Sequence, residues 1–468
     1  MVERDADRSH WRRAGAVFRS LINDLKRDDV SAAAELGIDL TSLREMITGE
    51  RPLTSEVIQK AVAIWPVNER DFHPLHDDCP DGIRLMRRAA SESSSRVLQR
   101  GGRDYYEYRD TAMSRVSMFR PEWIRMLHVA EGPDPAEPGV EWNNGHLLHQ
   151  FTYFVGEINY YYEWCGRRFC TAARTGDSVW GLPFAPHSFA ARRAGEVAYI
   201  LALTYGAGLV GDAQHELAVL GEESARRTAI PVGGEAEAGA ALLRLHVANA
   251  GLTPAVLERL AGIPAARIGT LLEGGARPDA DELARLASGL QVPAAALLPV
   301  TADTADGIRF LPAAEVVRWD YPDGGPPDYR LGRLAGSRLH PFTRGLEIDV
   351  LGGGADPARL ETGLHQYVYC LGPAPVRLRW EHRGSGYEET LEPGDSLYVE
   401  PFVRHGFSLP AGRGAARLLA LRIAGKTRLE GMAELGAMPP EGVARVAAED
   451  RQWYDPGLRA PAASRARG

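Results

Sequence analysis

Helical periodicity marks two separate segments of the chain, residues 29–65 and 251–290. In both, apolar residues recur at intervals of three and four, as on one face of a helix. Each segment has a glycine at its turn and a polar residue where a helix is predicted to begin: Gly37 and Thr41 in the first, Gly262 and Asp279 in the second. Both segments are therefore predicted to form a helix-turn-helix.

Strand-like patterns follow each helical segment. Short runs such as EVAYILALTY from Glu196 and RLLALRIA from Arg417 are separated by Gly and Pro, which is typical of small antiparallel barrels. These β regions are also duplicated. GDSVWGLPFAPH, ending at His187, shares G-D-S-x4-P-F-x2-H with GDSLYVEPFVRH, ending at His405, and HQFTYFVG from His149 matches HQYVYCLG from His365. We expect an α+β protein with a tandem repeat of a helical domain and a jelly-roll barrel.

Domain boundaries follow from shifts in composition. The segment 221–239 is rich in Gly, Glu and Ala and lacks a core pattern, so it is the natural joint between the halves. The final RAPAASRARG is expected to be disordered. The predicted organisation is a helical domain (10–75), a barrel (76–220), a linker (221–240), a second helical domain (241–300), a second barrel (301–450) and a tail (451–468).

Composition and charge exclude several classes of protein. The 468 residues are 44% hydrophobic and 25% charged, as in soluble globular proteins. No apolar run approaches the roughly 20 residues of a membrane span, and the charged N-terminus does not resemble a secretory signal, so we expect a cytoplasmic protein. The four cysteines lack metal-finger spacing and are expected to be reduced thiols. A net charge of −8 argues against a broad nucleic-acid-binding surface.

The stretch NNGHLLHQ, Asn143 to Gln150, contains the first candidate for a metal site. In a strand, His146 and Gln150 would share one face, and His149 would point to the other. A sharply turned G-D-x5-P-x3-H segment after such a strand resembles the cupin family, whose barrels hold a metal ion in the lumen. On that resemblance, His146, Gln150 and His187 would face the lumen, because imidazole ligands for first-row metals must converge.

The second barrel matches this pattern incompletely. Thr362 stands where the first barrel has His146, whereas Gln366 and His405 are retained. A second site built from His365, Glu400 and His405 remains an alternative, although His365 corresponds to the outward-facing His149. The second barrel is interpreted as a structural copy.

The order of the four domains, with NNGH and GDS…PHSF, resembles the methylphosphonate synthase and hydroxyethylphosphonate dioxygenase family over essentially the whole chain. The resemblance implies an oxygenase that uses Fe(II) and O2 on 2-hydroxyethylphosphonate and forms a homo-oligomer. In the dioxygenase the third iron ligand is a Glu six residues before the second His, and here that position is Gly181. The synthase instead uses a Gln four residues after the first His, which matches Gln150.

The family's phosphonate-contacting positions fall on four residues of matching type. These are Lys26, Arg100, Tyr108 and Asn143. The guanidinium of Arg can donate hydrogen bonds to two phosphonate oxygens at once, and the ammonium of Lys supplies a compact positive charge. Lys26 is expected to arrive from the other half of the chain or from another subunit, and without the family it would be interpreted as a solvated residue at a helix end. Tyr106 and Gly181 are expected to lie next to the residues that contact the metal and the substrate, without contacting either themselves.

Three functions compatible with the sequence remain besides methylphosphonate synthesis with release of carbon dioxide. The first is the dioxygenase reaction, which gives hydroxymethylphosphonate and formate. The second is a helix-turn-helix regulator, for which DNA-reading arginines would be Arg44, Arg51, Arg267 and Arg277; DNA is not expected as a partner. The third is an epoxidase-like oxygenase acting on another phosphonate.

Overall fold

The computed structural model describes residues 2–117, 119–352, 354, 359–410 and 414–453. It divides into two compact units, one combining Met1–Pro80 with Lys426–Gly468 and the other spanning Asp81–Gly425. Most of the predicted tail, residues 454–468, lies outside the described residues, and so does the predicted disorder of its last ten residues. All four cysteines are free thiols, as expected.

The first helical domain forms a helix-turn-helix around a buried apolar cluster that includes Phe18, Leu43 and Trp65. Its helices are α1 (Val2–Asp24), α2 (Asp29–Leu36), α3 (Leu40–Thr48), α4 (Ser55–Ile64) and the short 3-10 helix η1 (Glu69–Phe72). Gly37 ends α2 with φ at 62°, which glycine adopts without steric cost. The prediction that Thr41 begins the next helix is wrong: Asp39 caps α3, because its carboxylate is placed to accept from the Ser42 N–H.

The second helical domain repeats this design. It consists of α8 (Glu235–Asn249), α9 (Pro254–Ala261), α10 (Ala265–Leu272), α11 (Ala280–Leu290) and the 3-10 helix η2 (Ala294–Leu297). Asp279 caps α11, as predicted, through a capping box with Glu282. The segment predicted as a linker is partly helical, since it contains α7 (Glu222–Thr228), which follows α6 (Asp212–Leu220), and the start of α8.

The first barrel pairs a seven-stranded sheet in the order β11-β8-β5-β10-β4-β3-β2 with a three-stranded sheet in the order β7-β6-β9. Nine of these ten strands come from the first β region: β2 (Arg96–Arg100), β3 (Arg103–Asp110), β4 (Phe119–Met126), β5 (His149–Val155), β6 (Ile158–Trp164), β7 (Arg167–Ala173), β8 (Ser178–Gly181), β9 (His187–Ala191) and β10 (Tyr199–Tyr205). The short helix α5 (Arg88–Ser93) precedes them. Side chains of both sheets, among them Phe154, Phe189 and Ile200, fill the space between them.

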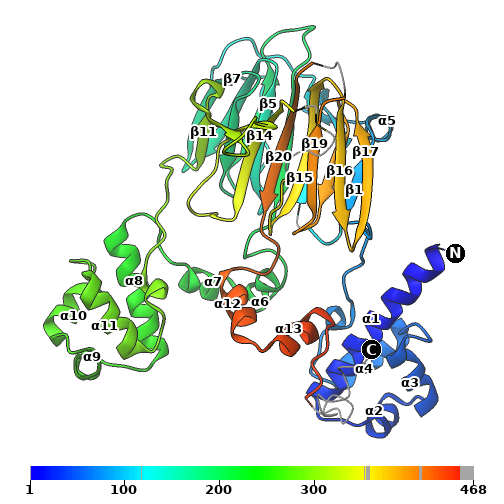
Figure 1. Cartoon of the computed structure of the whole chain (residues 1–468). Helices are drawn as coiled ribbons and strands as arrows, with labels where there is room; N and C mark the ends of the chain where they lie inside the picture. Colours follow the sequence, from blue (N-terminus) through cyan, green and yellow to red (C-terminus); the bar gives the residue numbers. More distant parts are fainter. Residues whose placement is uncertain (1, 118, 353, 355–358, 411–413, 454–468) are drawn as a thin grey trace. The chain divides into compact units, whose positions relative to one another are not determined.

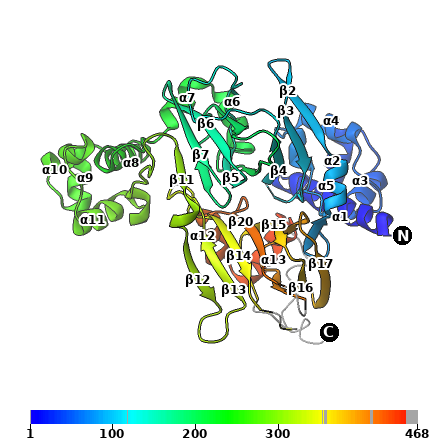
Figure 2. The same ribbon diagram turned by 90° about the horizontal axis from the view of Figure 1, so that it is seen from above.

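The second barrel has the same architecture, with sheets β1-β18-β15-β20-β14-β13-β12 and β17-β16-β19. Figure 2 shows β12, β13, β14, β20 and β15 of the larger sheet side by side. Its strands are β12 (Val317–Tyr321), β13 (Tyr329–Arg333), β14 (Thr343–Val350), β15 (His365–Pro373), β16 (Val376–His382), β17 (Ser385–Leu391), β18 (Ser396–Val399), β19 (Arg404–Ser408) and β20 (Ala416–Ile423). The 3-10 helix η3 (Ala313–Glu315) lies before β12. After β20 the chain forms α12 (Leu429–Ala437) and α13 (Pro440–Ala447), so the barrel ends earlier than the predicted residue 450.

Two short strands are exchanged between the barrels. β1 (Ile83–Met86) pairs with β18 of the second barrel, and β11 (Ile308–Leu311) pairs with β8 of the first. In Figure 1 the blue β1 accordingly lies among orange strands. Each strand buries its isoleucine, Ile83 or Ile308, in the core of the barrel that it joins. The predicted barrels, 76–220 and 301–450, are therefore not contiguous in sequence, because each of these ranges contains one strand that belongs to the other barrel.

Among the described residues, no single helix is long and apolar enough to cross a membrane. The helices Glu235–Asn249 and Pro254–Ala261, which meet at a bend of 96°, are long and apolar enough together, by length and composition only.

Candidate functional site

Strand β5 directs alternate side chains into and out of the first barrel. Gln150 faces the interior with Phe154, which belongs to the buried core of this barrel. His149 points away, where its ring stacks on Trp180 at 5.7 Å and lies 3.8 Å from the ring of His340, measured between centroids. The predicted faces of Gln150 and His149 are thereby confirmed.

His146 reaches the same interior by a different route from the one predicted. It lies before β5, which begins at His149, so strand alternation does not orient it. Its Nδ1 atom lies 2.8 Å from the Leu148 carbonyl oxygen, and its Nε2 atom lies 3.1 Å from Oε1 of Gln150. The bend at residues 147–148, rather than a strand, places the imidazole beside Gln150.

The second histidine comes from the opposite sheet. His187 is the first residue of β9, and its ring is nearly perpendicular to that of His146, with 5.3 Å between centroids. Its Nδ1 atom lies 2.9 Å from the Ala185 carbonyl oxygen, and its Nε2 atom lies 3.0 Å from Nδ2 of Asn143. Burial lowers the pKa of His187 to about 4, so the ring is neutral at physiological pH and has an electron pair to donate.

The hydrogen bonds of these groups fit a cation between them. The Gln150 amide nitrogen donates to Thr152 Oγ1 at 2.8 Å, which directs the amide oxygen toward His146. If His146 Nδ1 donates to the Leu148 carbonyl, the His146 Nε2 atom carries no proton. This atom and Oε1 of Gln150 are then two hydrogen-bond acceptors only 3.1 Å apart. A metal ion bound by both atoms would relieve this repulsion. Among the described residues no group of three His, Cys, Asp or Glu side chains could hold a metal, so a metal held here needs the amide as its third ligand.

These side chains line a cavity of about 310 Å³ inside the first barrel. Seven of the nine residues predicted from the sequence line it together: Arg100, Tyr106, Tyr108, Asn143, His146, Gln150 and His187. Gly181 is opposite Gln150 in the β5–β8 ladder. Lys26 belongs to the other unit, where its ammonium lies 4.9 Å from the ring centroid of Trp453 and donates to the Asp24 carbonyl at 3.2 Å. Its predicted role at the cavity stays a prediction.

The polar end of the cavity is built on the β2–β3 hairpin. The Arg100 guanidinium donates to the Glu141 carbonyl at 3.2 Å and lies 4.8 Å from the ring centroid of Tyr106. The Tyr106 hydroxyl accepts from the Phe189 N–H at 2.8 Å and so joins β3 to β9 behind the site. Burial raises the pKa of Tyr108, which keeps its hydroxyl protonated as a hydrogen-bond donor.

The cavity also contains a carboxyl group that the sequence analysis missed. Glu122 on β4 lines it, with Arg96 3.8 Å away, and burial raises the pKa of Glu122. Thr204 on β10 is also in the lining and is opposite Gln150 in the ladder. The alternation of polar and apolar residues in FRPEWIRM gives a signal for Glu122, since Glu122 and Ile124 share a face.

The second barrel contains an arginine at the corresponding place. Gln366 is opposite Arg422, as Gln150 is opposite Thr204. Arg422 Nε donates to Gln366 Oε1 at 2.6 Å, and the Gln366 nitrogen lies 2.9 Å from His405 Nε2. A guanidinium cation is therefore bonded to the amide that would otherwise be a metal ligand.

The alternative site in the second barrel does not form. His365 precedes Gln366 on β15 and points to the other face, where its Nδ1 atom lies 2.6 Å from the Tyr398 hydroxyl. His405 contacts Gln366 inside the second barrel, whereas His365 points to the outer face of the β15 sheet. The two histidines therefore cannot converge with Glu400 on one ion.

The arginines considered as DNA readers are all engaged within the helical domains. Arg44 pairs with Asp29 at 3.1 Å and Arg267 pairs with Glu282 at 2.8 Å. Arg51 donates to the Ser42 hydroxyl, and Arg277 forms an ion pair with Glu235. Reading a base would require each of these side chains to exchange its present partner for the DNA.

Known proteins resemble the chain over nearly its full length. A helix-turn-helix domain model matches residues 240–299. Methylphosphonate synthase of Nitrosopumilus maritimus (strain SCM1) is 38% identical over 450 residues, covering 96% of this chain and 97% of that protein. The structure of Streptomyces albus HEPD, with substrate 2-hydroxyethylphosphonate and Fe(II) bound, is 46% identical with a TM-score of 0.91, over 95% of this chain and 99% of that one. Native PhpD with cadmium atoms, at 18% identity and a TM-score of 0.71 over 93% and 99%, shares the fold.

Proposed function

The chain belongs to the family of methylphosphonate synthase and hydroxyethylphosphonate dioxygenase, a family of iron-dependent phosphonate oxygenases, and from this premise we propose that it converts 2-hydroxyethylphosphonate and O2 to methylphosphonate and carbon dioxide. The observation that carries the proposal is the third ligand position. Gln150 faces His146 and His187, and Gly181, opposite it, contributes no carboxylate. The amide is the ligand type that the resemblance associates with the synthase.

His146, Gln150 and His187 would hold Fe(II) through two imidazole nitrogens and an amide oxygen. Bound there, Fe(II) supplies the redox chemistry that activates O2 and a charge that polarises the substrate. A neutral amide in place of a carboxylate leaves the site with one more net positive charge, which favours an anionic substrate.

Arg100, Tyr108 and Asn143 would bind and orient the phosphonate group. The guanidinium can donate to two phosphonate oxygens, while the Tyr108 hydroxyl and the Asn143 amide fix its rotation. Ile124, Leu148 and Phe189 form an apolar wall of the same cavity. This wall would exclude water from the reacting carbon, which limits hydrolytic side reactions.

The dioxygenase reaction is the second candidate, and one observation favours it. The Streptomyces albus HEPD structure is 46% identical, more than the 38% of the methylphosphonate synthase. Both reactions would use the same metal site and substrate, so they differ only in products.

Phosphorus NMR of the products distinguishes the two reactions. The protein is loaded anaerobically with Fe(II), mixed with 2-hydroxyethylphosphonate and exposed to O2. The proposal predicts a methylphosphonate signal. Hydroxymethylphosphonate would assign the dioxygenase reaction instead, and unchanged substrate with iron-loaded protein would contradict both.

A further inference from the structure

A second cavity, of about 680 Å³, lies within the unit that contains both barrels. It is lined by the exchanged strand β11, by the end of β13, by the start of β14 and by the segment 334–342 that joins them. None of the residues lining it belongs to the cavity of the proposed iron site. Its volume falls in the range of small-molecule pockets, roughly 300–1,000 Å³.

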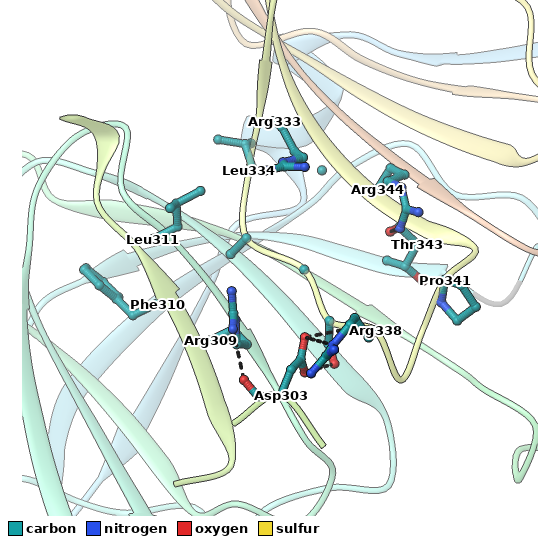
Figure 3. A pocket seen from close by; sticks show the side chains of 14 residues that line it. Asp303, Arg309, Phe310, Leu311, Arg333, Leu334, Arg338, Pro341, Thr343 and Arg344 are labelled. Carbon is teal, nitrogen blue, oxygen red and sulfur yellow. Dashed lines mark hydrogen bonds and ion pairs between the residues drawn. The ribbon is translucent and has the colours of Figure 1, made fainter. Parts of the chain in front are cut away.

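Four arginines and one carboxylate line this cavity. Arg309 and Arg338 lie on one side, near Asp303, and Arg333 and Arg344 lie on the other (Figure 3). The four arginines therefore surround the space from four different segments of the chain, β11, β13, β14 and 334–342. With that of Asp303, their formal charges sum to three positive charges.

The single carboxylate is already engaged. Asp303 accepts from the Ser337 hydroxyl at 2.6 Å and from the Arg338 backbone N–H at 2.9 Å. Burial alone would raise the pKa of Asp303, but these hydrogen bonds outweigh it and lower the pKa. The ionised Asp303 carboxylate therefore anchors segment 334–342 through Ser337 and Arg338. It also lies 3.9 Å from the Arg338 Nε atom.

Within the described part of the chain, the other three guanidinium groups form no ion pair, although the positive charge of Arg309 helps to lower the pKa of Asp303. Of the described residues, no carboxylate lies within 4 Å of a side-chain nitrogen of Arg309, Arg333 or Arg344. Arg309 donates to the Asp303 carbonyl at 3.0 Å and Arg344 donates to the carbonyl of Thr343 at 2.8 Å. An anion in the cavity would provide these three cations with an ion-pair partner.

We propose that this cavity binds a small organic phosphate or phosphonate dianion. Guanidinium forks match phosphoryl oxygens in pairs, and charge-assisted hydrogen bonds are the strong ones. Phe310, Leu311, Leu334 and Pro341 also line the cavity and provide contact for an apolar substituent. The site is separate from the proposed catalytic one and does not rest on the proposed reaction.

Calorimetric titration of the metal-free, full-length protein tests the proposal, with phenylphosphonate and inorganic phosphate as probes. Arg333→Gln/Arg344→Gln removes two exposed cations from this cavity. Arg100→Gln removes the cation of the first-barrel cavity and so identifies any binding that occurs there. Arg167→Gln/Arg193→Gln is the matched control, because it removes two exposed cations of the first barrel that do not line this cavity.

We expect Arg333→Gln/Arg344→Gln to weaken phenylphosphonate binding by about tenfold or more at one site. That site should remain in Arg100→Gln and in the control. Phenylphosphonate should also bind more tightly than inorganic phosphate. Unchanged binding in Arg333→Gln/Arg344→Gln, or an equal loss in the control, would overturn the site. If phenylphosphonate binds no more tightly than inorganic phosphate, the proposal that the ligand is an organic dianion would be wrong.

Discussion

Gln150 and Gly181 are directly opposite each other on neighbouring strands β5 and β8. A Cβ atom added at Gly181 would meet only a methyl carbon of Ile308, at 3.9 Å. The glycine therefore leaves open space beside the Gln150 side chain. The resemblance to the dioxygenase implies a carboxylate ligand at the position of Gly181, so a Glu placed there is a candidate to substitute for the proposed ligand Gln150.

If Gln150 is a metal ligand, as proposed, a carboxylate introduced by Gly181→Glu should be able to take its place. We expect Gln150→Ala to weaken Fe(II) binding by roughly a hundredfold, and Gln150→Ala/Gly181→Glu to recover most of it, because the added carboxylate finds open space opposite position 150. Anaerobic Fe(II) titration followed by desalting measures this. No recovery in the double variant, with the fold intact by circular dichroism, would contradict the ligand exchange.

Arg100 should contribute to phosphonate binding through its fork geometry. Arg100→Lys keeps the charge but loses the second donor, so we expect KM for 2-hydroxyethylphosphonate to rise about tenfold, with a smaller effect on kcat. Arg103→Lys is the matched control, since Arg103 donates to the Gly139 carbonyl and does not line the cavity. Steady-state oxygen consumption measures both variants, and equal KM values in the two would contradict the assignment.

The second barrel should bind no iron because Arg422 is bonded to Gln366. We expect one iron per chain in the wild type. Thr362→His/Arg422→Thr, which copies the first-barrel residues, should create a second and weaker site that disappears when Gln366→Ala is added. Metal analysis after desalting measures the stoichiometry. Two irons per wild-type chain would contradict this account.

His405 should make the protein sensitive to acid. Burial lowers the pKa of His405 from its ordinary 6.5 to about 4, so its contribution to the free energy of unfolding is complete above pH 6.5 and is lost as the pH falls through 4. From these two values we expect roughly 3 kcal/mol to be lost at pH 4.

Urea unfolding at several pH values isolates this contribution. The difference in unfolding free energy between wild type and His405→Asn should shrink on acidification, whereas that between wild type and His215→Asn, at an exposed histidine, should not change. A difference for His405→Asn that stays constant between pH 7 and 4 would contradict the account.

Local rules were sufficient for much of the fold and for part of the site. Helical periodicity with Gly37, Gly262 and Asp279 predicts both helix-turn-helix segments, since caps and left-handed turns act over a few residues. Strand alternation places Gln150 and His149 on their correct faces. The repeated G-D-S-x4-P-F-x2-H predicts two barrels of the same design.

Longer-range relations were not predictable in the same way. The strands IRLM and IRFL are too short to specify a partner, and only the repeated DGIR, whose Ile and Arg begin each strand, indicates that they play equivalent parts. His146 depends on a bend that no periodicity describes. The equivalence of Arg422 and Thr204 requires the register of strands that are far apart in the sequence.

Comparison of Gln150→Ala with Gln366→Ala by phosphorus NMR tests the central claim most directly, because the two glutamines occupy matching positions in the two barrels. With Fe(II), 2-hydroxyethylphosphonate and O2, wild type and Gln366→Ala should both form methylphosphonate, and Gln150→Ala should form little or none. Full methylphosphonate formation by Gln150→Ala, or loss in Gln366→Ala alone, would contradict the assignment of the iron site to the first barrel.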